Sequence, residues 1–236
     1  MAKRDIIYRD SKFSISYEIL NRDEKETIIF LHGWGSSKAF MKNIFSNSFK
    51  NYKHIYIDLI GFGESDNPPF PLNSFDYKDI LDIFFQKLDI NKDMIFGHSF
   101  GGKIATLLNP TKLILLSSAG IVEQKSVLVQ LKIYSYKLFK NLGFDSILKF
   151  MISDDGKNLS KNMYETFKNV VDENFSHIFK SRNSGTTDIF WGRDDLATSL
   201  HSGKKINSLI YQSNFHIFEG DHFFFIGKSD EIENLI

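Results

Sequence analysis

The stretch Met94-Ile95-Phe96-Gly97-His98-Ser99-Phe100-Gly101-Gly102 decides the fold, because it joins a short apolar strand to a helix through a glycine-rich turn. It satisfies the pattern G-x-S-x-G, in which the serine sits on a sharp, strained turn that exposes its hydroxyl above a sheet. The residues two before and two after the serine come close together, so only small side chains fit there, and both are glycine. Residues 103–108 have a helical pattern, and this context predicts Ser99 as a nucleophile.

The same pattern, a short apolar segment that ends near a glycine, recurs along the chain. It is seen at residues 27–32, 54–59, 113–116, 189–191 and 215–218. Such segments are typical of strands buried on both faces. Between them lie helical stretches, such as residues 75–88, which carry apolar side chains at a 3.6-residue period. Strands that alternate with helices predict an α/β fold with a mostly parallel central sheet and helices on both faces.

Two shorter segments at the N-terminus, residues 6–8 and 13–20, are predicted as further strands. The second alternates apolar and polar residues, the pattern of a half-exposed strand. Ligands of parallel sheets bind at the carboxyl ends of the strands, where the glycine-marked loops fall in this chain.

One interval, between Gly120 and Gly185, has no buried-strand pattern. Residues 127–139, 146–152 and 162–179 are helical in pattern instead. Because a loop of this length without structure is unlikely, we expect a helical sub-domain there. The chain is thus predicted to have a core of residues 1–120 and 185–236 and a helical cap of residues 121–184, which lies on the side of the site.

A serine hydroxyl needs a base to act as a nucleophile at neutral pH. Of the seven histidines, His222 is predicted as this base, because it follows the last predicted strand, at the end of the sheet where Ser99 lies. The base needs a carboxylate that orients it, and Asp194 and Asp195 both follow the strand at 189–191. The chemistry alone leaves both aspartates open. The chain order Ser, Asp, His differs from that of chymotrypsin and of subtilisin.

Acyl transfer also needs two N–H groups that stabilise the negative charge of the tetrahedral intermediate. The residue after the nucleophile, Phe100, supplies one backbone N–H. We expect the second from Trp34, in the loop His32-Gly33-Trp34-Gly35 after the first buried strand.

These parts together resemble the α/β-hydrolase superfamily, in its helical-capped serine hydrolase branch. The resemblance covers nearly the whole chain, from residue 27 to about residue 226. It includes the stretch Asp58-Leu59-Ile60-Gly61-Phe62-Gly63-Glu64-Ser65, similar to the family pattern D-x-x-G-x-G-x-S. In the family the acid stands three residues after the glycine of W-G-x-x-D, which selects Asp195, and the histidine of a C-terminal G-x-H matches His222.

The resemblance implies an α/β-hydrolase fold and a serine hydrolase that cleaves a carboxylic ester or thioester through an acyl-enzyme on Ser99. No metal and no organic cofactor are implied. A carbon–carbon bond hydrolase or a lyase with the same triad stays open as an alternative, and so does a non-catalytic ligand-binding member of the fold. Serine at position 99 excludes the branches of the superfamily that carry an aspartate nucleophile at this turn. The helix that follows Ser99 and the last helix of the chain are expected to be short.

The amino-acid composition excludes some classes of binding partner. Lys+Arg and Asp+Glu both number 29, and this balance argues against nucleic-acid binding. Cysteine is absent, which excludes disulfides and a cysteine nucleophile. The sequence shows no secretory signal and no apolar run of membrane-spanning length, so we expect a cytoplasmic protein. Residues 121–184 carry ten Lys or Arg against seven acids, so besides a small acyl substrate an acidic acyl carrier protein is a conceivable partner, although a solvated helix face also explains the charge.

Overall fold

The computed structural model describes residues 2–122 and 160–236 of the chain. Within these ranges the core is one eight-stranded sheet with the strand order β1-β2-β4-β3-β5-β6-β7-β8. The strands are β1 (Ala2–Tyr8), β2 (Ser11–Leu20), β3 (Thr27–Leu31), β4 (Lys53–Ile57), β5 (Met94–His98), β6 (Lys112–Leu116), β7 (Thr186–Gly192) and β8 (Asn214–Phe218).

The direction of the strands agrees with the sequence patterns. β1 pairs with β2 and β2 with β4 in antiparallel fashion, and every pairing from β4 to β8 is parallel. β3 and β5 are buried along their whole length, as continuous apolar segments require, whereas β1 and β2 are partly exposed. The predicted mostly parallel sheet is confirmed.

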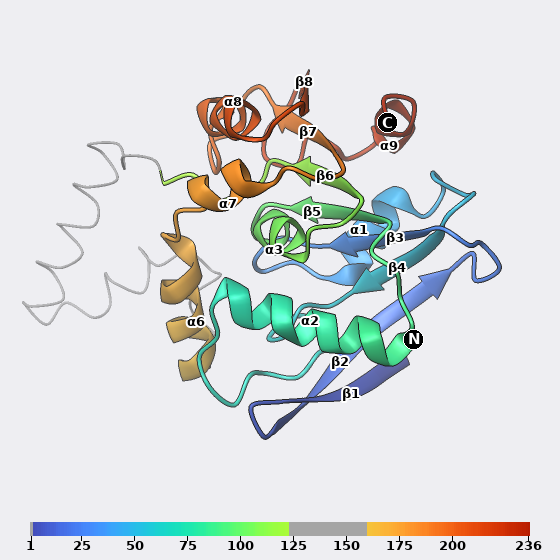
Figure 1. The fold of residues 1–236 in the computed structure, drawn as a ribbon, viewed down its shortest axis with the longest axis vertical. Helices are drawn as coiled ribbons and strands as arrows, with labels where there is room; N and C mark the ends of the chain where they lie inside the picture. The colour runs from blue at the N-terminus through green and yellow to red at the C-terminus, as the bar shows by residue number, and fades with distance from the viewer. Residues whose placement is uncertain (1, 123–159) are drawn as a thin grey trace, which may run out of the picture.

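Helices cover both faces of the sheet (Figure 1). On one face, α2 (Ser74–Leu88), α3 (Phe100–Leu108) and α8 (Leu200–Leu209) bury their apolar sides in a large cluster of side chains. On the other face, α1 (Lys38–Phe45) and α9 (Ser229–Glu233) pack on a second, smaller cluster. The two layers hold the sheet rigidly, so the loops at its carboxyl edge extend from a fixed base.

The predicted short helices are observed. α3 has nine residues and ends at Asn109 in a left-handed conformation, and α9 has five residues. The predicted helix 75–88 is present as α2, which begins with a capping box on Asn73. Within the described ranges, no helix combines the length and the apolar composition that crossing a membrane requires.

Part of the predicted cap lies inside the described residues. A single helix over residues 162–179 was the expectation, and this is wrong: the segment forms α6 (Lys161–Val171) and α7 (Ser176–Ser181) with a break between them. The predicted helices at 127–139 and 146–152 lie outside the described residues.

Tertiary contacts explain the break between α6 and α7. The Glu173 carboxylate accepts hydrogen bonds from Lys103 Nζ at 2.5 Å and from the Ser74 backbone N–H at 3.3 Å. The Phe175 N–H donates to the Gly120 carbonyl at 2.8 Å. These bonds to other elements replace the helical ones, so the chain turns there instead of continuing as a helix.

Candidate functional site

Ser99 lies at the sharp turn between β5 and α3. Its backbone has φ 50° and ψ −114°, a conformation that few residues with a side chain adopt. The strain is held by bonds to neighbouring segments: the Ser99 N–H donates to the Leu116 carbonyl, and the Ser99 carbonyl accepts from the N–H groups of Gly102 and Ala119. Such a turn positions the hydroxyl at the carboxyl edge of the sheet.

The glycines of the turn are required by close backbone contacts. A Cβ atom at Gly97 would lie 2.6 Å from the Gly101 carbonyl oxygen, and one at Gly101 would lie 2.4 Å from the Leu31 carbonyl oxygen. Both distances are far below van der Waals contact. The spacing of the motif therefore follows from how closely β5, α3 and β3 approach one another.

His222 and Asp195 form a hydrogen-bonded pair beyond the ends of β8 and β7. His222 Nδ1 lies 2.8 Å from Asp195 Oδ2, and the side chains are 15% and 0% exposed. Asp195 Oδ1 accepts from the N–H groups of Ala197 and Thr198, and the Thr198 hydroxyl donates to Oδ2 at 2.9 Å. Burial favours the neutral acid, but the hydrogen bonds from His222 and Thr198 outweigh it and hold the pKa of Asp195 below its usual value.

Of the two aspartates left open by the chemistry, Asp195 is the one that contacts His222. Asp194 is exposed, and its N–H donates to the Gly220 carbonyl. Because Nδ1 of His222 faces the carboxylate, its Nε2 is the ring nitrogen left for a proton acceptor.

Ser99 and His222 line one cavity, but no hydrogen bond joins their side chains among the described residues. Nucleophile–base bonds are often long in structures without substrate and tighten in the complex. The three side chains are thus brought to one edge of the sheet, with the Asp195–His222 pair formed and the Ser99–His222 contact open.

His98, beside Ser99, packs against the His222 ring and is hydrogen-bonded to the His222 backbone. Its Nε2 lies 3.2 Å from the His222 carbonyl oxygen, and the two ring centroids are 4.7 Å apart. Burial lowers the pKa of His98 to about 3, so the ring is neutral at pH 7 and donates from Nε2. Sequence reasoning assigned this side chain no role, whereas the structure makes it a support for the His222 loop.

The loop of Trp34 is fixed by a second buried histidine, His32. The Leu59 N–H donates to His32 Nε2 at 3.1 Å, which leaves the ring proton on Nδ1 to donate to the Gly33 carbonyl at 2.8 Å. Burial lowers the pKa of His32 to about 4 and keeps it neutral. A trans peptide is planar, so its C=O and N–H point in opposite directions. The Trp34 N–H therefore points away from buried His32.

The Phe100 N–H is the second expected donor. Phe100 is the first residue of α3, and the first N–H groups of a helix have no acceptor within the helix. The positive end of the helix dipole lies at the same place, which favours a negative charge beside Ser99.

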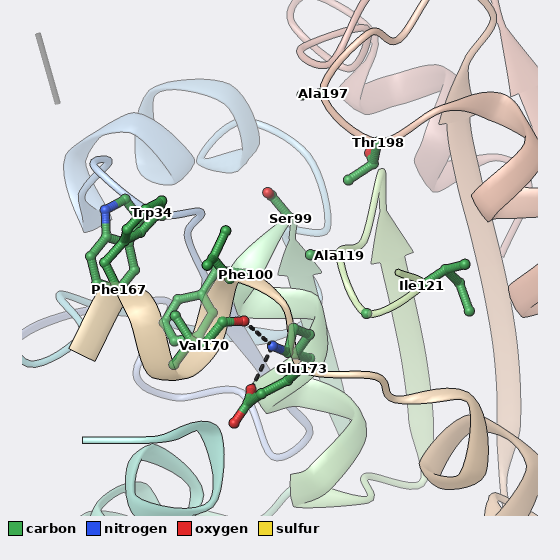
Figure 2. Close-up of a pocket in the computed structure, with 13 residues that line it drawn as sticks. Trp34, Ser99, Phe100, Ala119, Ile121, Phe167, Val170, Glu173, Ala197 and Thr198 are labelled. Atoms are coloured by element: carbon green, nitrogen blue, oxygen red, sulfur yellow. Dashed lines mark hydrogen bonds and ion pairs between the residues drawn. The ribbon is translucent and has the colours of Figure 1, made fainter. Parts of the chain in front are cut away.

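Two cavities meet at Ser99. The first, here called the Phe167 cavity, has a volume of about 240 Å³. Its wall is mainly apolar and comes from the loop of Trp34, from α3 and from α6; it includes Phe100, Ile121, Phe167, Val170 and Thr198. Figure 2 shows these side chains around the Ser99 hydroxyl.

An ion pair lies in the wall of the Phe167 cavity away from Ser99 (Figure 2). Lys103 Nζ, whose side chain is 2% exposed, donates to Glu173 Oε2 at 2.5 Å and to the Val170 carbonyl at 2.6 Å. Burial lowers the pKa of Lys103, and Glu173 opposes this shift. The pair joins α3 to the end of α6, so it sets the distance between the α6 wall and Ser99.

The second cavity, the Phe40 cavity, has a volume of about 310 Å³. The residues that line it are Gly33, Trp34, Gly35, Ser36, Phe40, His98, Ser99, His222 and Phe223. The rings of Phe40 and Phe223 meet edge to face with centroids 5.7 Å apart. This cavity contains both Ser99 and His222, whereas His222 does not line the Phe167 cavity.

The described residues contain no group of three or more His, Cys, Asp or Glu side chains arranged to hold a metal ion. Sequence reasoning missed three residues of the site: His98, Thr198 and Lys103. Only Thr198 has a local signal, because it stands three residues after Asp195, where a hydroxyl can reach back to the carboxylate.

Comparisons with known proteins agree with this architecture. The family model described as alpha/beta hydrolase fold matches residues 26–110. Among solved structures, an esterase from Exiguobacterium antarcticum superposes with a TM-score of 0.70 at 19% identity, covering 94% of each chain.

Two of the curated relatives that this chain resembles carry the names of enzymes. A 2-hydroxy-6-oxononadienedioate/2-hydroxy-6-oxononatrienedioate hydrolase of Pseudomonas putida is 25% identical over 82% of this chain and 80% of its own length. A 1-acylglycerol-3-phosphate O-acyltransferase of Arabidopsis thaliana is 31% identical over 42% of this chain. This chain spans only 22% to 38% of the length of the first four relatives that it matches. The strand order, the family model and the solved structures agree, and the chain has the α/β-hydrolase fold.

Proposed function

We propose that the chain is a serine hydrolase that cleaves a carboxylic ester or thioester through an acyl-enzyme on Ser99. The observation that carries the proposal is the shared cavity of Ser99 and His222, in which His222 is already paired with Asp195 at 2.8 Å. A buried, ionised Asp195 holds His222 in the tautomer whose Nε2 accepts a proton.

In the first half-reaction, Ser99 Oγ forms a bond to the carbonyl carbon while its proton passes to His222 Nε2. The carbonyl oxygen takes the negative charge, and the N–H groups of Trp34 and Phe100 stabilise it. The bond to the leaving group then breaks, and the leaving atom takes the proton from Nε2. A water molecule repeats the sequence on the acyl-enzyme, giving the acid and free Ser99, so one ester and one water give one acid and one alcohol.

The test is a Ser99→Ala variant beside the parent enzyme, assayed with short and medium acyl esters and thioesters. We expect the variant to lose ester hydrolysis by at least about a thousandfold while its unfolding transition is unchanged. A fluorophosphonate should label the parent at Ser99 and not the variant. Ester hydrolysis at the parent rate in Ser99→Ala would overturn the mechanism.

A second candidate is hydrolysis of a carbon–carbon bond by the same triad. It is favoured by the similarity of this chain, along most of its length, to the Pseudomonas putida hydrolase. A dienoate diketone in the same screen separates the two, since turnover of that compound alone would favour the second candidate over the first. A non-catalytic, ligand-binding role would leave all substrates intact.

An acidic carrier protein as partner is the finer part of the proposal. Its motivation is the excess of basic residues in 121–184, of which the lysine-rich run from Lys125 to Lys140 lies outside the described residues. Turnover of a carrier-bound ester should then fall as salt rises, beside salt-insensitive turnover of a small free ester. Equal salt dependence of the two substrates would argue against this partner.

A further inference from the structure

We propose that the substrate lies across Ser99 with its acyl group in the Phe167 cavity and its leaving group in the Phe40 cavity, and that both groups are uncharged. The assignment rests on the proposed function and names the substrate class for the same site. It follows from how the two cavities differ in their walls.

The leaving group is placed by the proton that it must receive. A general acid reaches its partner at about 2.6–3.2 Å, so the leaving atom has to lie on the side of His222. Ser99 lines both cavities, and His222 lines only the Phe40 cavity. The leaving group therefore occupies the Phe40 cavity, and the acyl group is left with the Phe167 cavity.

The Phe167 cavity fits an apolar acyl group. Its Lys103 and Glu173 charges neutralise each other, and Lys103 already donates to Glu173 and Val170, so a charged acyl end finds no unpaired counter-charge there. Since one water-sized group takes about 30 Å³, the volume of about 240 Å³ accommodates about eight such groups. This corresponds to a short or medium acyl chain.

The Phe40 cavity fits a leaving group without formal charge. The described residues that line it include no Asp, Glu, Lys or Arg, and its buried His98 is neutral at pH 7. The edge-to-face rings of Phe40 and Phe223 offer an apolar side, and Gly33 and Gly35 offer bare backbone. An alcohol or phenol matches this lining.

Two matched variants test the assignment. Phe167→Ala and Phe40→Ala each remove one partly buried ring, and each ring lines only one of the two cavities. Rapid quenching followed by intact-protein mass measurement gives the rate of acyl-enzyme formation and the rate of its hydrolysis. Leucine at the same positions serves as a second pair if an alanine variant does not fold.

The two half-reactions separate the cavities, because the acyl group is still bound during deacylation and the leaving group has already departed. With 4-nitrophenyl esters, Phe167→Ala should change deacylation of hexanoyl and octanoyl enzymes by about tenfold and that of the acetyl enzyme by less than about twofold. Phe40→Ala should change deacylation of the acetyl, hexanoyl and octanoyl enzymes by the same factor, because the attacking water takes the place of the leaving group beside His222. It should change acylation by a benzyl ester relative to a methyl ester by about tenfold.

A reversed pattern, in which the effect of Phe40→Ala on deacylation depends on acyl length and that of Phe167→Ala does not, would overturn the assignment. So would two variants that leave both half-reactions unchanged. Faster turnover of an ester with an anionic acyl end than of its neutral isostere would refute the uncharged class. Failure of the proposed function is recognised separately, because in that case the parent itself forms no acyl-enzyme with any ester and the assignment falls with it.

Discussion

Replacing Lys103 by Met should lower the free energy of unfolding by about 2.5 to 5 kcal/mol. The lysine is the polar link between α3 and the end of α6, and its side chain is 2% exposed. Methionine has a similar length and apolar stem, so the packing of the stem is largely kept and the charge and the hydrogen bonds are what the substitution removes.

The magnitude follows from the groups left behind. The Val170 carbonyl loses a donor at 2.6 Å, and an unsatisfied buried carbonyl costs about 1–3 kcal/mol. Glu173 loses its cation but is 20% exposed and keeps its bonds from Ser74, so this loss adds only about 1 kcal/mol. The Lys103 ammonium also lies 4.6 Å from the centre of the Phe175 ring, a contact worth about 0.5–1 kcal/mol.

Urea unfolding followed by circular dichroism measures the change, with Lys78→Met as the matched control. Lys78 pairs with Asp82 at 2.9 Å on the surface of α2, with side chains 33% and 31% exposed, and its loss should cost less than about 1 kcal/mol. Adding Glu173→Gln to Lys103→Met should recover roughly 1 kcal/mol, since no unpaired charge is then left.

Equal costs for the two methionine variants would refute the reasoning, because the buried pair would then contribute no more than a solvated one. A further loss on adding Glu173→Gln would show that the remaining carboxylate is stabilised by other partners. Hydrolysis of medium-chain esters by Lys103→Met should also fall more than hydrolysis of acetate esters, because the α6 wall is no longer fixed.

Asp195→Asn should reduce kcat about ten-thousandfold through loss of the productive imidazole tautomer, whereas Asp194→Asn, at an exposed position, should stay within about threefold; equal losses would contradict the pairing seen in the structure. Thr198→Val should shift the acid limb of the pH–kcat/KM profile to higher pH by up to about one unit, since the Asp195 carboxylate loses a hydroxyl donor and becomes more basic. Thr198→Ser retains the hydroxyl and should reproduce the parent profile. Burial lowers the pKa of His98 to about 3, so between pH 7 and 5 the unfolded chain takes up a proton that the folded chain refuses, and this group alone removes about 2 kcal/mol of stability. His98→Gln should lessen that acid destabilisation by the same amount in urea titrations, and the exposed control His201→Gln should not.

The carboxyl edge of the sheet could be predicted because its signals are local. A strand buried on both faces has to be apolar along its length, and the turn at Ser99 has to carry glycines where backbones touch. Errors arise where a local pattern competes with a distant partner. Residues 162–179 have the apolar period of one helix. However, Glu173 forms an ion pair with Lys103, 70 positions earlier, and the helix is interrupted there.

The ends of elements show the same limit on a smaller scale. The apolar run from 54 to 59 predicts a strand to Leu59, but β4 ends at Ile57. Asp58 leaves the sheet because its carboxylate accepts the Lys38 N–H at the start of α1 and the Glu64 N–H. Neither partner is visible from the residues beside Asp58.

By itself, the sequence determined the class of fold, the sharp turn at Ser99 and the chain order of Ser99, the aspartates and His222, since each depends on neighbouring residues and on the period of apolar side chains. Asp195 was selected over Asp194 by the family resemblance, and the structure shows its contact with His222. Only the tertiary structure decided that His98 supports the His222 loop and that Lys103 lies in a cavity wall. These contacts join β5, β7, β8 and the returning part of 121–184. Because their geometry depends on how separate elements pack, no local pattern encodes them.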